Sequence, residues 1–185
     1  MKIGFDGKRA VQNFTGLGNY SRYILEILCK FYPQNEYILY APRKRSNEKL
    51  SELLAQYPQA KMAYPSTSFG KKLSSIWRIW GISKQIEQEG VQLYHGLSNE
   101  IPLNVKKKGF KTIVTIHDLI FLRFPQYYKY IDRQIYTYKF RKACLNADKI
   151  IAVSECTKRD IIDIFQIQEN KIEVVYQGCD ESFKE

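Results

Sequence analysis

Apolar residues along this chain fall into two kinds of segment, which alternate from one end to the other. Short apolar runs predict strands at 2–6, 36–41, 60–64, 91–94, 112–116, 149–153 and 171–176. Apolar residues spaced three or four positions apart predict helices at 17–32, 69–89, 127–146 and 154–165, with a shorter helix at 46–56. This alternation predicts an α/β domain that is doubly wound, with a mainly parallel sheet and helices on both faces.

Particular residues mark where these helices should begin and end. Ser46 and Ser154 are expected N-caps, because a serine hydroxyl can accept a hydrogen bond from a free amide of the first turn. Gly90 is expected to end the helix at 69–89. The polar segment up to Thr15 and the segment 121–126 are expected to be loops.

The length of 185 residues fits one domain, and we expect residues 1–185 to form a single unit. No apolar run approaches the roughly 20 residues that a membrane-spanning helix needs. The cysteines are scattered and include no C-x-x-C pair, which is typical of reduced thiols and favours a cytoplasmic location. With only His95 and His117 besides, no dedicated metal site is expected.

The chain carries 29 Lys and Arg residues against 19 Asp and Glu, and its net charge of +10 favours anionic partners. Nucleotide diphosphates, acidic lipid headgroups and nucleic acids all meet that description. The basic clusters are spread through the chain, whereas a nucleic-acid-binding protein usually gathers them on one recognition element. We therefore expect no nucleic acid among the partners.

Ligands of a parallel α/β sheet gather beyond the C-terminal ends of its strands, so the residues that follow each strand are candidates for a site. Gly16-Leu17-Gly18 stands before the first long helix, where backbone amides and the helix dipole can hold an anionic group. The alternative is a flexible turn. A dinucleotide-binding fingerprint is disfavoured, because the third glycine position holds Ser21.

His117 and Asp118 directly follow the apolar strand at 112–116, at the mouth of the expected crevice. Either side chain can bond a sugar hydroxyl or stabilise charge at a reacting centre. The alternative is structural, with Asp118 simply turning or capping the chain. His95 follows an earlier strand and is a weaker candidate of the same kind.

The segment 127–142 mixes tyrosines with Lys and Arg on a predicted helix. Such a helix can lie against an anionic membrane or a lipid-linked acceptor. The alternative is a basic solvated face whose tyrosines pack on the sheet.

The order of five short motifs is more specific than any one of them. A Gly-x-Gly-x-Tyr loop at 16–20 is followed by HGLSNEIP at 95–102, VTIHDLIFLRFP at 114–125, ADKIIAVSECTKRDII at 147–162 and KIEVVYQGCDESF at 171–183. This succession resembles the N-terminal half of retaining GT-B glycosyltransferases of the group 1 or family 4 type. The resemblance extends over residues 3–183.

The resemblance implies a Rossmann-like, acceptor-side domain of a hexosyltransferase. Such an enzyme transfers a sugar from a nucleotide-sugar to a glycan or lipid-linked acceptor with retention of configuration, as in polysaccharide biosynthesis. The nucleotide-sugar would be held by a C-terminal domain that is absent from residues 1–185, so this part alone should be inactive. No cofactor and no metal are expected, because helix dipoles and basic side chains can stabilise the leaving diphosphate.

The resemblance also assigns roles to individual residues. His117 would be the catalytic residue that approaches the transferred sugar. The other candidates share a substrate-binding role, from the glycine loop that faces the donor diphosphate, from a cleft-edge loop and from beside the histidine: Gly16, Gly18, Asn99, Glu100 and Asp118.

A second hypothesis is a non-catalytic module that binds a glycan or an anionic lipid through the same crevice and the basic surface. Under either hypothesis we expect a cytoplasmic protein. Peripheral contact with the inner face of the cell membrane is expected if the segment 127–142 binds lipid.

Overall fold

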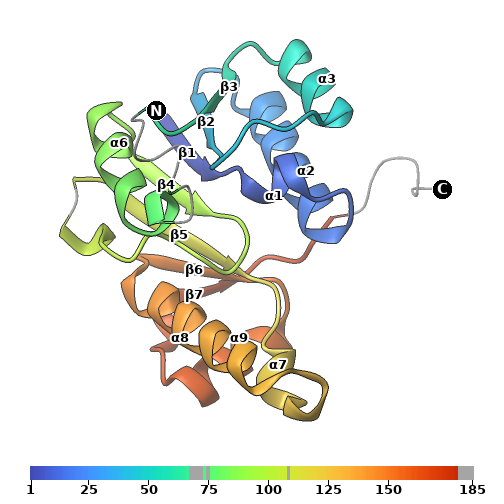
Figure 1. Ribbon diagram of the computed structural model, residues 1–185, viewed down its shortest axis with the longest axis vertical. Coiled ribbons are helices and arrows are strands. Elements are labelled where there is room, and N and C mark those ends of the chain that lie inside the picture. The colour runs from blue at the N-terminus through green and yellow to red at the C-terminus, as the bar shows by residue number, and fades with distance from the viewer. Residues whose placement is uncertain (67–72, 74–75, 108, 179–185) are drawn as a thin grey trace.

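The computed structural model describes residues 1–66, 73, 76–107 and 109–178. Within them, seven strands form one parallel sheet in the order β3-β2-β1-β4-β5-β6-β7 (Figure 1). The strands are β1 (Lys2–Asp6), β2 (Glu36–Tyr40), β3 (Ala60–Ala63), β4 (Leu93–Gly96), β5 (Lys111–Ile116), β6 (Lys149–Ala152) and β7 (Ile172–Val174). The prediction of a doubly wound, Rossmann-like α/β domain is confirmed, and its strand order reverses between β1 and β4.

Helices cover both faces of this sheet (Figure 1). The α-helices are α1 (Lys8–Gln12), α2 (Gly16–Phe31), α3 (Glu48–Gln56), α6 (Ile82–Gln88), α7 (Ile120–Arg123), α8 (Tyr130–Asn146) and α9 (Glu155–Phe165). A π-helical turn, η1 (Trp77–Gly81), leads into α6. Short 3-10 turns are η2 (Val105–Lys107), η3 (Pro125–Tyr127) and η4 (Glu169–Lys171).

Strand β2 shows how the two faces are built. Tyr37 and Leu39 belong to the apolar core beneath α2 and α3. Ile38 and Tyr40, on the alternate positions, belong to the core that also contains residues of α6, α8 and α9. Because side chains of a strand alternate between faces, a strand covered on both sides must be apolar throughout.

Helix ends follow the sequence in some places and depart from it in others. Ser154 caps α9 as predicted, with its Oγ accepting a hydrogen bond from the Thr157 amide at 3.1 Å. Gly90 follows α6 as predicted and has a left-handed φ of 68°. The prediction that Ser46 caps α3 is wrong, because Asn47 is the N-cap and its Oδ1 accepts a hydrogen bond from the Leu50 amide.

Several predicted bounds also change. The expected loop before Thr15 contains α1, and the expected loop at 121–126 is occupied by α7 and η3, so α8 begins at Tyr130. The strand predicted at 91–94 lies two residues later, because β4 pairs with β1 from Leu93 onward. Of the helix predicted at 69–89, residues 69–72 and 74–75 lie outside the described part.

The tyrosines of the segment 127–142 do not pack on the sheet as a group. Tyr127, Tyr130 and Tyr138 are each more than half exposed, so the packing alternative is wrong for these three. The buried positions of α8 are Ala143 and Cys144, near its C-terminal end. Among the helices of the described residues, none is long and apolar enough to cross a bilayer.

Candidate functional site

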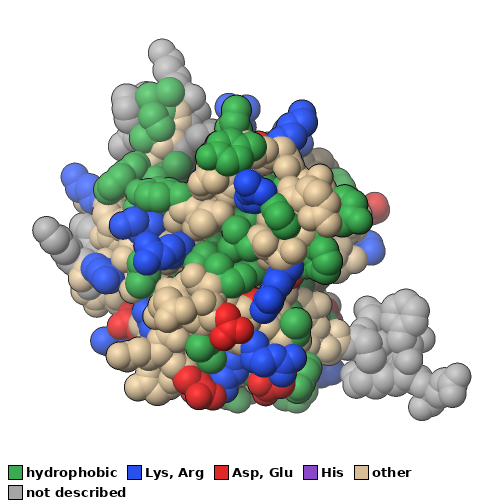
Figure 2. All heavy atoms as spheres, turned by 90° about the horizontal axis from the view of Figure 1, so that it is seen from below, with side chains coloured by type: hydrophobic (Ala, Val, Ile, Leu, Met, Phe, Trp, Pro, Cys, Tyr) green, Lys and Arg blue, Asp and Glu red, His purple; other side chains and the backbone are tan. Residues whose placement is uncertain are grey.

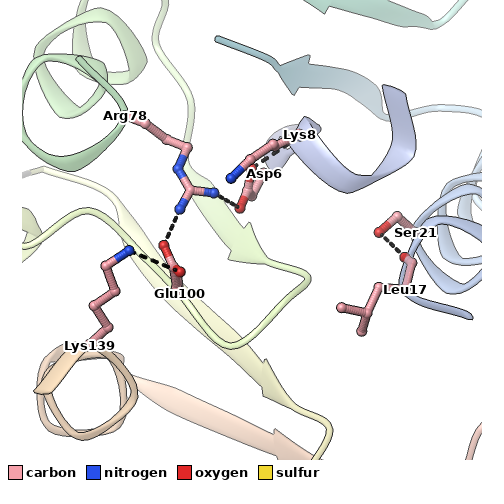
Figure 3. A network of polar contacts seen from close by, with 7 residues as sticks. All are labelled: Asp6, Lys8, Leu17, Ser21, Arg78, Glu100 and Lys139. Atoms are coloured by element: carbon pink, nitrogen blue, oxygen red, sulfur yellow. Dashed lines mark hydrogen bonds and ion pairs between the residues drawn. The ribbon is translucent and has the colours of Figure 1, made fainter. Parts of the chain in front are cut away.

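A buried carboxylate lies at the end of β1, beside the point where the strand order reverses. Asp6 accepts a hydrogen bond from the Lys8 amide at 3.1 Å, where α1 begins. Its other oxygen lies 3.3 Å from Nη1 of Arg78 (Figure 3). The Asp6 side chain is only 4% exposed, and a charge so deeply buried requires a compensating partner.

Arg78 extends from η1 and connects Asp6 to Glu100 on the loop after β4 (Figure 3). Lys139 of α8 lies 3.4 Å from the other Glu100 oxygen. Burial alone would lower the pKa of Arg78, but the carboxylates of Asp6 and Glu100 outweigh it and raise that pKa. Four segments that are distant in sequence therefore form one charged network at the carboxyl edge of the sheet.

Two cavities share Arg78, Ile79 and Lys139 in their walls. One has a volume of about 330 Å³, and most of its lining side chains are apolar. The other has a volume of about 310 Å³ and is lined mostly by Lys and Arg. Glu100 lines the first cavity, and its predicted role in binding substrate stays a prediction.

His117 stands at the end of β5 with both ring nitrogens engaged. Nε2 lies 2.9 Å from the carbonyl oxygen of Leu97, and Nδ1 lies 2.9 Å from the side-chain amide nitrogen of Gln177. Burial lowers the pKa of His117, so the imidazole is neutral at pH 7. A carbonyl can only accept, which places the single proton on Nε2 and leaves the Nδ1 lone pair directed at Gln177.

Asn99 holds the backbone beside this histidine. Its side-chain oxygen accepts a hydrogen bond from the His117 backbone amide at 2.8 Å, and its own backbone amide donates to the Thr115 carbonyl at 2.9 Å. Asn99 has a φ of 64°, in the left-handed region that asparagine tolerates better than most residues. The structure thus gives Asn99 a positioning role, and its predicted contact with substrate stays a prediction.

The predicted glycine loop lies at the N-terminus of α2. Gly16 is the first helical residue, and a Cβ added to it would meet nothing within 4 Å. A Cβ on Gly18 would lie 1.8 Å from the carbonyl oxygen of Asn13, so this glycine allows α2 to approach the preceding backbone. Gly18 therefore has a packing role, whatever the loop binds.

Two further sequence candidates have structural partners. Asp118 accepts a hydrogen bond from the Ile120 amide at 3.2 Å, which matches the alternative that Asp118 turns the chain, whereas Leu119 is the N-cap of α7. His95 is buried against Thr115, whose Oγ1 lies 2.8 Å from its Nε2. Burial, together with the nearby His117, lowers the pKa of His95 to about 4. In the described part of the chain, no three His, Cys, Asp or Glu side chains gather as they would around a metal ion.

Asp6 and Lys8 lie in the segment after the first strand, where ligands are expected, but they were not predicted as site residues, and neither was Arg78. A signal for Asp6 was present, because a charged side chain directly follows Phe5 at the end of the strand. Arg78 lies among apolar residues of a predicted helix and belongs to no motif. Its role follows only from the approach of η1 to β1.

Comparison with known proteins identifies the class. Residues 20–183 match the family model described as Glycosyltransferase Family 4, and the chain belongs to that family. It is similar in structure to a glycosyltransferase from Rickettsia africae ESF-5, with a TM-score of 0.49 and 15% sequence identity. That likeness covers 96% of this chain but 42% of the other. No curated protein matches the sequence.

Proposed function

We propose that this chain is the acceptor-side domain of a GT-B hexosyltransferase that transfers a sugar from a nucleotide-sugar with retention of configuration. The family match supports a glycosyltransferase, and the fold supplies a crevice at the switch point between β1 and β4. The observation that carries the proposal furthest is the arrangement around His117.

The ring of His117 is fixed on three sides. Leu97 holds Nε2, Asn99 holds the backbone amide, and the Tyr20 ring meets the imidazole edge-on at 4.7 Å between centroids. The remaining nitrogen, Nδ1, presents a lone pair to an exposed side-chain amide. A sugar hydroxyl that displaced Gln177 would donate to Nδ1 in the same way, so His117 would orient the transferred sugar.

The leaving diphosphate would lie near the start of α2, with no metal or cofactor taking part. Gly16 has open space above it, and the free amides of the first helical turn favour a negative group. Thr15 at the N-cap uses its Oγ1 to bond Asn13 at 2.8 Å rather than the helix amides. The Gly18 amide donates to the Thr15 carbonyl at 2.9 Å, so the amides of Gly16 and Leu17 are the ones proposed to meet a ligand.

The nucleotide-sugar itself would be bound by a second domain outside residues 1–185. Transfer requires both reactants to be positioned in a closed cleft from which water is excluded. We therefore propose that residues 1–185 alone turn over little or no donor.

The test measures transfer from radiolabelled UDP- and GDP-hexoses by the complete product of the source gene. His117→Ala should lower kcat about 100-fold. The control is Asp118→Asn, which should change kcat less than about 5-fold, because the Asp118 side chain bonds the Ile120 amide and an asparagine oxygen can do the same. Unchanged turnover by His117→Ala would remove His117 from the proposal. Full turnover by residues 1–185 alone would remove the second domain from it.

Contact with a membrane is a second proposal, and exposed side chains near α8 support it. Phe124, Tyr127, Tyr130 and Ile131 are each at least half exposed. The face at the bottom of Figure 1, seen in Figure 2, mixes hydrophobic side chains with Lys and Arg. Aromatic and basic side chains together favour an anionic bilayer surface. The protein would then act as a peripheral protein at the inner face of the cell membrane.

Vesicle sedimentation tests this second proposal. The chain should bind vesicles that contain phosphatidylserine and release them when Arg141 and Lys142 are both changed to Glu. The matched control changes Lys30 and Lys49, which are exposed on other helices, to Glu. Equal loss of binding in the two double variants would reduce the effect to net charge and contradict a specific face.

A further inference from the structure

The apolar cavity at the carboxyl edge has the chemistry of a hydrocarbon site. Its wall is formed by η1, the loop after β4 and α8, and its apolar side chains are those of Ile79, Tyr94, Ile101, Pro102, Leu103, Ile135 and Tyr138. The other lining side chains are those of Asp6, Arg78, Glu100, Gln134 and Lys139, and four of these are already paired with one another. A glycan would have to break those pairs to find partners for its hydroxyls. An alkyl or isoprenyl chain would instead remove apolar surface from water.

Hydrogen bonds to backbone carbonyls hold the wall of this cavity together. The Leu103 amide donates to the Ile79 carbonyl at 3.0 Å, and the Asn104 side chain donates to the Trp80 carbonyl at 3.1 Å. Asn146 of α8 donates to the Leu103 carbonyl at 3.2 Å. These bonds join all three parts of the wall, so a ligand would enter a preformed site.

The adjoining cavity has the opposite character. Its lining side chains are those of Lys8, Gln12, Pro42, Arg43, Arg45, Arg78, Ile79 and Lys139, five of them cationic. Of these cations, Arg78 and Lys139 face the carboxylates of Asp6 and Glu100, and Lys8 and Arg45 add two further positive charges. Positive charge therefore remains in excess at this hollow. Burial, followed by the charges of Arg78 and Arg9, lowers the pKa of Lys8, as expected where cations crowd together.

The two cavities meet at Arg78 and Lys139, so an anionic group in one lies next to an apolar chain in the other. The apolar cavity also opens onto the surface of α8, because Ile135 lines it and is 45% exposed. Ile131, one helical turn away, is 70% exposed and continues the apolar path. A chain longer than the cavity would leave along this path.

We infer that the paired cavities bind one amphiphile, with a phosphate in the basic cavity and its hydrocarbon chain in the apolar cavity. The acceptor class is thus a lipid phosphate or a lipid-linked phosphoglycan. This inference rests on the proposed function in one respect, because it takes the bound amphiphile to be the acceptor. The binding site itself does not depend on sugar transfer.

The test is calorimetric titration of the 185-residue chain with three probes: octyl phosphate, inorganic phosphate and octyl glucoside. The two octyl compounds are kept below their critical micelle concentrations. Octyl phosphate should bind at least about 10-fold more tightly than either of the others, because it alone fills both cavities. Equal affinity for inorganic phosphate would reduce the site to a free-anion site and overturn the inference. Equal affinity for octyl glucoside would overturn it as well.

Two matched pairs of variants locate the binding. Arg45→Gln should weaken octyl phosphate at least about 5-fold, whereas Lys44→Gln, on the same exposed loop but outside the cavity, should not. Ile135→Ser should weaken octyl phosphate without affecting inorganic phosphate, and Ile131→Ser should leave both unchanged. Equal effects within either pair would overturn the inference.

Failure of this inference can be distinguished from failure of the proposed function. Tight octyl phosphate binding by a complete gene product that transfers no sugar would retain the site and discard the transferase proposal. Sugar transfer to a lipid-free glycan that octyl phosphate does not inhibit would retain the transferase proposal and discard the amphiphile site.

Discussion

Arg78 lies against Asp6 at the switch point of the sheet, with its Nη1 3.3 Å from the Asp6 Oδ2. The two side chains are 13% and 4% exposed, and they come from positions 72 residues apart. A buried carboxylate that loses its ion-pair partner is costly, because its charge is then uncompensated in a medium of low dielectric. This pair therefore links the stability of the domain to the shape of its site.

Replacing Arg78 tests the weight of this pair. Arg78→Met should lower the free energy of unfolding by about 3 kcal/mol, because it strands Asp6. Lys139→Met, which removes a more exposed partner of Glu100, should cost less than about 1 kcal/mol. Urea unfolding monitored by circular dichroism measures both. Similar values for the two variants would show that the buried pair has no special weight.

The second prediction separates the two glycines of α2. Gly18→Ala should destabilise the domain by about 2 kcal/mol, because its Cβ would lie 1.8 Å from the Asn13 carbonyl oxygen, and backbone must move. Gly16→Ala should be neutral or stabilising by roughly 0.5 kcal/mol, since its Cβ enters open space and alanine favours a helix. Thermal unfolding of the two variants compares them directly. A Gly18→Ala protein as stable as wild type would contradict the packing role.

The third prediction compares two helix caps. Ser154→Ala should cost about 1 kcal/mol, because one amide of α9 loses its partner. Asn47→Ala should cost about 2 kcal/mol or more, because this buried side chain caps α3 and also donates to the carbonyls of Ala10 and Val11.

Denaturant midpoints at constant slope measure the difference between these caps. An Asn47→Ala cost no larger than that of Ser154→Ala would mean that the bonds from α3 to α1 contribute nothing.

The fourth prediction concerns pH. The pKa of His95 falls from 6.5 to about 4 on folding, chiefly through burial, so the unfolded chain binds a proton that the native protein does not. Stability contributed in this way is complete above pH 6.5 and declines as the pH falls toward 4. Between pH 7 and pH 5 the loss from this group should be about 2 kcal/mol.

The variant His95→Asn isolates that contribution. Its free energy of unfolding should fall less between pH 7 and pH 5 than that of the wild type, because the titrating group is gone. Urea unfolding at both pH values provides the four measurements. Parallel pH dependences in the two proteins would show that His95 is not the group responsible.

The site illustrates how far local pattern extends. His117 was predicted because it directly follows a buried strand, and parallel strands all end at one edge. What holds its ring was not predictable, since Leu97 and Asn99 come from the loop after a neighbouring strand. Glu100 was expected at the cleft edge, but its pairing with Arg78 depends on a π-helical turn that periodicity does not reveal.

The alternation of strands and helices and the Ser154 cap could be read from the sequence alone, and from that alternation followed the doubly wound parallel sheet. These features depend on neighbouring residues, because helix and strand periods and capping are short-range properties. The network of Asp6, Arg78, Glu100 and Lys139, and the basic hollow beside an apolar one, could be seen only once the chain was folded. The direct contacts of this network join residues up to 72 positions apart, and their formation depends on strand order and helix approach rather than on local sequence.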